Sequence, residues 1–243
     1  MIIDAHVRLG RGREVALAAD DLLATMDRLG IDRAIVAPDE RCIAVDNRAG
    51  NEMVAAASAA SGGRLVPYAV ANPWRGAAAV DELRRARDLG ARALNVDSVL
   101  QGFDLLDGLL DPLLEFARES GWFVYVRTGT PPNALPLPLA TLARRFPDLS
   151  FVMGRSGATD FWIDAAPALR HAANLYGDTC YAPWDTVLTE LAGDPAIGVS
   201  RLLFSTDAPY TVPEAEWRRV RDWPLTEGKR AEVLGNVAAR LLG

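Results

Sequence analysis

The chain has 243 residues, half of them apolar, and a formal net charge of −6. That length suits one large α/β domain or two small ones, and the apolar share allows a large core. No run of basic residues offers a nucleic-acid surface. No apolar stretch reaches the ~18 residues of a membrane span, and the start lacks the basic-then-apolar pattern of a signal peptide. We therefore expect a cytoplasmic protein that binds neither nucleic acid nor membrane.

Two residue counts narrow the chemistry further. The cysteines, Cys42 and Cys180, form no spaced framework, so we expect neither a disulfide nor a thiolate cluster. The chain has only two histidines, His6 and His171, which excludes a site built from a cluster of imidazoles. His171 ends the run "ALRH", where a role as a helix C-terminal cap is favoured over catalysis.

In chain order, short apolar runs alternate with longer amphipathic ones. The short runs are bounded mostly by Gly, Pro or Asp, and they predict strands at 2–4, 33–37, 65–70, 93–96, 123–127, 150–153, 175–178 and 202–205. Apolar periodicity and terminal glycines predict helices at 19–30, 47–63, 77–90, 111–121, 139–147, 162–173, 184–193 and 229–243. This alternation implies parallel strands joined by right-handed crossovers.

Eight such units in this length predict an α/β fold with a single (β/α)₈ TIM-barrel domain over residues 1–243. The alternative is an open doubly wound sheet, which usually carries a Gly-rich phosphate turn after its first strand. The sequence "DAHVRLGRGR" does not form that turn convincingly. The Pro-rich segment "TGTPPNALPLPLA" follows the fifth strand, and we interpret it as a stiff loop on the active face.

Functional residues of such barrels lie at the carboxyl ends of the strands. The side chains found there include His6 and Arg8 after the first strand, Arg127 at the end of the fifth, Arg155 after the sixth and Asp207 after the eighth. Five segments ending at these positions or following them form ordered motifs, namely "IIDAHVR", "VYVRTG", "RRFPDLSFVMGRSG", "RLLFSTDAP" and "VLGNVAARLLG".

These motifs resemble those of the amidohydrolase superfamily, in the amidohydrolase-related branch that includes decarboxylases acting on carboxymuconate semialdehyde. The resemblance runs over nearly the whole chain and implies a barrel of the metal-dependent-hydrolase type. It also implies metal ligands, which are histidines on the first, fifth and sixth strands and an aspartate on the eighth. His6 and Asp207 match that pattern, whereas Arg8, Arg127 and Arg155 stand where it has histidine.

The three arginines change the chemistry that the pattern allows. A guanidinium is always protonated and offers no lone pair to a metal. A catalytic zinc usually takes three protein ligands, and two matching positions are too few. A cation about 4 Å from a dication is repelled by roughly 8 kcal/mol at an effective dielectric near 20. We therefore predict no tightly held catalytic metal and no other cofactor.

Two hypotheses follow for the arginines. In the first, the protein is a metal-independent hydrolase, similar to a lactonase, whose small anionic or carboxylated substrate is held by Arg8, Arg127 and Arg155. Asp207, with His6, would then handle water or protons, although nearby arginines make Asp207 a weak base. In the second, the barrel is catalytically inactive and binds a small anion or serves as a partner subunit.

Aromatic residues in the loops after the strands are further candidates for the substrate pocket. Trp74 follows the third strand, and Tyr181 and Trp184 follow the seventh. These side chains can line a pocket or simply pack the loops together. Asp4 and Asp97 could neutralise the arginines together with Asp207, which would leave a structural network of ion pairs. The family resemblance also implies that the protein could form a homodimer.

Overall fold

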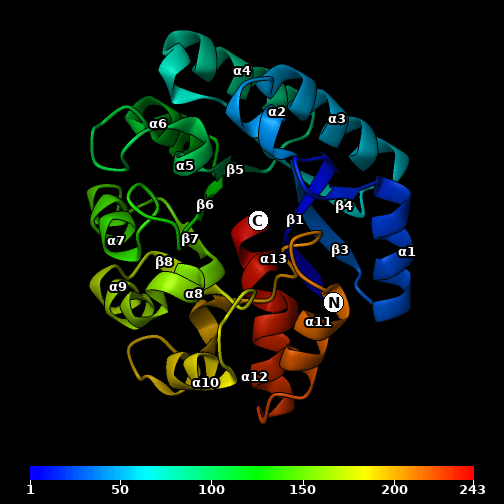
Figure 1. The fold of residues 1–243 in the computed structure, drawn as a ribbon, viewed down its shortest axis with the longest axis vertical. Coiled ribbons are helices and arrows are strands. Elements are labelled where there is room, and N and C mark those ends of the chain that lie inside the picture. The colour runs from blue at the N-terminus through cyan, green and yellow to red at the C-terminus, as the bar shows by residue number, and fades with distance from the viewer.

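The computed structural model describes residues 1–243, apart from the side chain at position 159. Eight parallel strands follow one another around the sheet in chain order (Figure 1): β1 (Ile3–Arg11), β3 (Arg33–Pro38), β4 (Leu65–Ala69), β5 (Ala93–Val96), β6 (Phe123–Arg127), β7 (Phe151–Gly154), β8 (Leu175–Asp178) and β9 (Leu202–Leu203). The short β2 (Ala16–Leu17) pairs antiparallel with the end of β1. All eight predicted strands are therefore present.

The sheet closes into a barrel because the segment that follows β9, the last strand, forms backbone hydrogen bonds with β1, the first strand. The amide of Ala5 donates to the carbonyl of Phe204 at 2.9 Å, and the amide of Asp207 donates to the carbonyl of His6 at 3.1 Å. A third bond runs from Arg8 N–H to the carbonyl of Ala208. Closure confirms the TIM barrel and excludes the open doubly wound sheet.

Most of the helices surround the strands, and the last one lies near the centre of the view (Figure 1). They are α1 (Ala19–Leu29), α2 (Glu40–Ala44), α3 (Asn47–Ala60), α4 (Ala77–Asp88), α5 (Ser98–Gln101), α6 (Asp111–Glu119), α7 (Pro136–Arg145), α8 (Ala158–Phe161), α9 (Ala165–His171), α10 (Asp185–Gly193), α11 (Pro213–Arg221), α12 (Glu227–Ala231) and α13 (Val237–Leu242). A π-helical turn at Glu232–Asn236 joins the last two. No helix in the described chain combines the length and apolarity needed to cross a bilayer.

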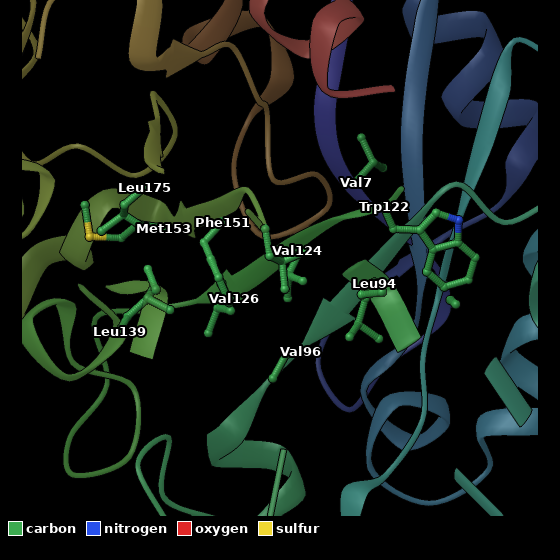
Figure 2. Packing of buried hydrophobic residues seen from close by; sticks show 14 of the residues in the cluster. Val7, Leu94, Val96, Trp122, Val124, Val126, Leu139, Phe151, Met153 and Leu175 are labelled. Carbon is green, nitrogen blue, oxygen red and sulfur yellow. The ribbon is translucent and has the colours of Figure 1, made fainter. Parts of the chain in front are cut away.

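Two apolar clusters hold the barrel together. The larger one lies between strands and helices and includes Val124, Val126 and Met153, with Leu139 of α7 packed beside them (Figure 2). The smaller one fills the inside of the barrel and includes Ile3, Phe123, Val152 and Leu203, with Val237 of α13. Side chains alternate between the two clusters along each strand because the strand period is two. That alternation decides which residues face the interior of the barrel.

Candidate functional site

A cavity of about 780 Å³ opens at the carboxyl ends of the strands. Such a volume lies within the range of small-molecule sites. Its walls carry three acidic residues, Glu14, Glu40 and Asp97, and the rings of Tyr181 and Tyr210. They also carry six arginines, which are Arg8, Arg11, Arg13, Arg41, Arg127 and Arg155. The protein as a whole is acidic, so this concentration of guanidinium groups is a local feature.

The strand period explains why charged residues reach this cavity. On β6, Phe123 and Tyr125 face the barrel interior, and Arg127 falls two residues further on the same side. On β1 the register shifts between Asp4 and Val7. Ala5 belongs to the interior cluster while Val7 packs in the outer one, so the irregularity moves His6 and Arg8 to the interior side.

Asp207 is held by two partners below the cavity. Its Oδ1 lies 3.0 Å from Nδ1 of His6, and its Oδ2 lies 2.7 Å from a terminal nitrogen of Arg155. Burial by itself would raise the pKa of Asp207, but Arg155 and His6 outweigh burial and hold the pKa below its usual value. Burial lowers the pKa of His6. The pair is therefore a carboxylate and a neutral imidazole whose Nδ1–H donates to Asp207.

Asp97 holds the other two arginines. Its Oδ2 accepts from Arg8 at 2.8 Å, and its Oδ1 lies 3.8 Å from a terminal nitrogen of Arg127. Burial acts to raise the pKa of Asp97, yet Arg8 and Arg127 together lower it overall, so the carboxylate stays ionised. Oδ1 also accepts from the backbone N–H of Leu100 at the start of α5. We call Arg8, Arg127, Arg155, Asp97 and Asp207 the inner ring.

Arg127 differs from the other two arginines of the inner ring. Its side chain is 19% exposed, and its guanidinium donates no hydrogen bond among the described residues and has only the distant contact with Asp97. Burial lowers its pKa, which records the cost of a guanidinium that has lost water without gaining close partners. Arg127 is therefore the most exposed of the three arginines in the ring and the one without a close charge partner.

Two tyrosines fix the remaining arginines in place. The guanidinium of Arg155 lies over the ring of Tyr181 at 4.5 Å and over that of Tyr210 at 5.4 Å. The guanidinium of Arg8 lies 5.4 Å from the same Tyr210 ring. Contacts of this kind between a cation and an aromatic face are attractive. They help to hold Arg8 and Arg155 in the wall of the cavity, where both guanidinium groups contact Tyr210.

Backbone strain is concentrated at the same end of the barrel. Five non-glycine residues in the described chain have positive φ, namely Arg155, Ser156, Ala158, Tyr181 and Asp207. All five follow β7, β8 or β9. Each such conformation costs on the order of 1–3 kcal/mol and persists where the surroundings impose it, as at functional sites. The strain marks this end as a site whose geometry is maintained against a local cost.

The donor set of the inner ring does not fit a metal ion. No group of three or more His, Cys, Asp or Glu side chains in the described part of the chain is arranged to hold one. The remaining imidazole nitrogen, Nε2 of His6, lies 3.2 Å from Nδ2 of Asn95. An amide nitrogen only donates, so this contact occupies the lone pair that a metal would need. Burial and, to a smaller extent, the positive charges of Arg8 and Arg155 lower the pKa of His6, and the same two charges would repel a metal cation bound there.

A second buried layer supports His6. The ring of Tyr125 stacks on the imidazole with centroids 4.1 Å apart, and the Tyr125 hydroxyl donates to Asp178 at 2.8 Å. Ser205 donates to the same carboxylate oxygen. Asn95 and Asp178 stand at strand ends, where sequence reasoning expects functional residues, whereas it missed Tyr125 and Tyr210 as neighbours of the site. Both could have been found from the sequence. Tyr125 lies two residues before Arg127 and so on the same side of the strand, and Tyr210 follows the eighth strand.

The residues singled out from sequence fall into two groups. His6, Arg8, Arg127, Arg155 and Asp207 lie together, and Tyr181 lines the cavity beside them. The two tryptophans lie outside the walls of the cavity. The Trp74 indole N–H donates to the carbonyl of Gln101, and Trp184 packs edge-on against Trp162 at 5.2 Å. Each indole therefore contacts a residue that does not belong to the cavity wall. His171 ends α9, as expected.

Comparison with known proteins agrees with this architecture. The structure is similar to 5-carboxyvanillate decarboxylase from Sphingomonas paucimobilis, with a TM-score of 0.79, 18% identity, and 99% of this chain and 98% of that one covered. It is similar to 2,6-dihydroxybenzoate decarboxylase from Rhizobium, with a TM-score of 0.74, 18% identity, and 100% and 99% covered. The 5-carboxyvanillate decarboxylase of Novosphingobium aromaticivorans, solved with manganese and 4-hydroxy-3-methoxy-5-nitrobenzoic acid, gives a TM-score of 0.80 at 16% identity, with 100% and 96% covered.

At these identities the solved structures establish the fold alone. No curated protein matches the sequence. The family model described as amidohydrolase matches residues 3–243, which is almost the entire chain. The chain therefore belongs to the amidohydrolase family.

Proposed function

We propose that the barrel mouth binds a small molecule bearing a carboxylate, without a bound metal, and that Arg127 is the residue that receives this group. The observation that carries the proposal is the state of Arg127, which lines the cavity, is partly exposed and has no hydrogen-bonded partner among the described residues. A guanidinium can bind a carboxylate through two parallel hydrogen bonds. Arg8 and Arg155 would flank the bound anion.

The names of the structural relatives support the same ligand class. They act on aromatic acids, 5-carboxyvanillate and 2,6-dihydroxybenzoate. One of them binds manganese. In the present chain, Arg8, Arg127 and Arg155 stand where the family resemblance implies histidine ligands. A carboxylate that a metal could hold in such relatives would here contact guanidinium groups directly, and the rings of Tyr181 and Tyr210 would lie beside it.

Metal-independent hydrolysis of a carboxylated lactone is the second candidate. The guanidinium groups that flank the cavity support it, because they could stabilise an oxyanion. Its weak point is proton transfer. Asp207 and His6 are each only 1% exposed, and Asp207 already contacts both His6 and Arg155. Neither side chain belongs to the cavity wall. Binding therefore has stronger support than hydrolysis.

The binding proposal is tested by calorimetric titration of benzoate and 2,6-dihydroxybenzoate into protein treated with a chelator. Arg127→Gln removes one charge-assisted hydrogen-bonding group, so affinity should fall by about 10- to 100-fold. The matched control is Arg84→Gln, which removes the same charge from α4, where Arg84 is 56% exposed and pairs with Asp81. Its affinity should match that of the wild type. A wild-type protein that binds no carboxylate, or an Arg127→Gln variant that binds equally well, would overturn the proposal.

Hydrolysis is tested separately with a panel of carboxylated lactones in chelator, by following acid release in a pH-stat. Asp207→Asn should abolish any turnover found, because it removes the one ionised carboxylate next to His6. Turnover that persists in this variant would rule out Asp207 as the base. No turnover on any lactone, together with intact carboxylate binding, would leave the second candidate without support.

A further inference from the structure

Asp97 lies in the cavity wall beside the arginine proposed to receive the ligand. It is fully buried, lines the cavity and lies between Arg8 and Arg127. Its two oxygens contact different arginines, at 2.8 Å and 3.8 Å. The carboxylate is therefore a fixed negative charge next to the guanidinium that a ligand would contact.

The positive and negative charges of the inner ring do not balance. Arg8, Arg127 and Arg155 contribute three positive charges, and Asp97 and Asp207 contribute two negative ones. His6 does not add a charge, because burial lowers the pKa of its imidazole. The ring thus has one positive charge in excess, and a single anionic group on the ligand balances it.

Charges at the rim of the cavity affect a bound ligand less than the buried charges of the inner ring do. The charged residues of the rim are Arg11, Arg13, Glu14, Glu40 and Arg41. Arg13 pairs with Glu14, with side chains 85% and 74% exposed, and Arg41, whose side chain is 80% exposed, pairs with Asp46. The carboxylate of Glu40 accepts from the backbone N–H of Arg13 in an exposed hydrogen bond. Water and salt screen charges at such positions, whereas buried charges are screened much less. The charge of the ligand's anionic group is therefore matched by the inner ring and only weakly by the rim.

We infer that Asp97 is a specificity residue that limits the ligand's anionic group to one negative charge. A dianionic group, such as a phosphate or phosphonate, would bring a second charge next to the buried Asp97 carboxylate with no further cation in the inner ring to balance it. Replacing Asp97 by a neutral residue would leave two positive charges in excess and favour a dianion. This inference rests on the proposed binding of an anion at Arg127.

The test compares two ligands of similar shape and different charge, benzenesulfonate and phenylphosphonate, above the second pKa of the phosphonate. Calorimetric titration of wild-type protein should give tighter binding of the sulfonate. In Asp97→Asn the ratio of the two affinities should shift toward the phosphonate by about tenfold or more. Asparagine keeps an oxygen to accept from Leu100 N–H, so α5 retains its cap.

Glu14→Gln is the matched control, because it removes the same charge from the exposed rim of the same cavity. The ratio should move by less than about twofold. Asp97→Ser, which also caps helices, replaces Asp97→Asn if that variant does not fold. A wild type that prefers the phosphonate overturns the inference even without a variant.

The outcomes separate the two proposals. If the wild type binds benzoate but the ratio in Asp97→Asn equals the wild-type ratio, Asp97 does not select charge while the ligand site stands. If no monoanion binds the wild type at all, the proposed function itself fails.

Discussion

The two ends of the barrel interior are filled by opposite kinds of side chain. At the amino end, Ile3, Val66 and Phe123 pack with Val237 of α13, all nearly inaccessible to solvent. At the carboxyl end, the strands and the segments directly after them carry the inner ring, with five charged groups and strained backbone at Arg155 and Asp207. One strand can serve both ends, as β6 does with Phe123 and Arg127.

The amino end of the barrel therefore contributes mainly to stability, and the carboxyl end carries the residues proposed to bind the ligand. Burial of apolar surface at the amino end stabilises the fold at roughly 25 cal/mol per Å². The carboxyl end gathers charges whose desolvation opposes folding unless partners compensate. Variants at the amino end should therefore change stability alone, and variants at the carboxyl end should change stability and binding in proportions that depend on each residue's partners.

The largest effect is expected at the amino end. Phe123→Ala leaves a cavity where a fully buried ring packs against Tyr68. The free energy of unfolding should fall by about 3–5 kcal/mol, measured by urea denaturation. Carboxylate affinity of the folded fraction should not change, because Phe123 lies two positions below Tyr125 and away from the cavity. A loss of affinity in folded protein would show that the two ends are coupled.

A smaller loss is expected when one partner of the inner ring is removed. Asp207→Asn keeps an acceptor for His6 Nδ1–H but leaves Arg155 without its charge partner. Breaking such a buried pair costs on the order of 3 kcal/mol, again measured in urea. The variant raises the ring's excess positive charge, so carboxylate affinity should rise in the protein that stays folded. Unchanged stability would mean that Arg155 finds another partner.

Much of the fold could be predicted because apolar periodicity marks the helices and strands, and glycines mark where many helices end. The first strand was underestimated at 2–4, since the polar residues His6 and Arg8 interrupt the apolar run of a strand that extends over Ile3–Arg11. Helix α11 was missed because its sequence, "PEAEWRRVR", is mostly charged and has few apolar residues to reveal a period.

The members of the candidate site could be predicted because strand ends converge in a barrel. Which arginine meets which carboxylate could not, because that depends on side-chain packing across the mouth. Asp97 was only one possible neutraliser, yet it contacts both Arg8 and Arg127. Asp4 instead accepts from Thr206 and does not reach an arginine of the ring. The loop tryptophans could not be placed either, since loop packing leaves no periodic signal.

The pH dependence of stability should differ between Asp178, which is buried beneath the site, and the carboxylates of the inner ring. Burial raises the pKa of Asp178 from 3.8 to about 7, although Tyr125 and Ser205 donate hydrogen bonds to it. The folded protein therefore binds a proton that the unfolded chain releases above about pH 4, and stability falls as pH rises toward 7. The asparagine in Asp178→Asn cannot ionise. Between about pH 5 and pH 7, the free energy of unfolding of this variant should therefore fall by about 2 kcal/mol less than that of the wild type.

The measurement is a series of urea transitions for wild type and Asp178→Asn across this pH range. Asp4, whose pKa is also raised to about 7 by burial, stays in both proteins, so a shallower slope should remain in the variant. Equal slopes in the two proteins would show that Asp178 is not protonated in the folded state. Asp97 and Asp207 act in the opposite direction, since their lowered pKa values make stability fall only in more acidic solution.

The smallest effect is expected at a residue that lies near the mouth without lining it. Trp184 is 56% exposed and packs edge-on against Trp162. Trp184→Ala removes that contact but leaves no closed cavity, so the free energy of unfolding should change by less than about 1 kcal/mol. Carboxylate affinity, measured by the same titration, should stay at the wild-type value, whereas Tyr181→Ala, which uncovers Arg155, should weaken it. A weaker affinity in Trp184→Ala would place this ring in the ligand site after all, and the aromatic wall of the cavity would then extend beyond Tyr181 and Tyr210.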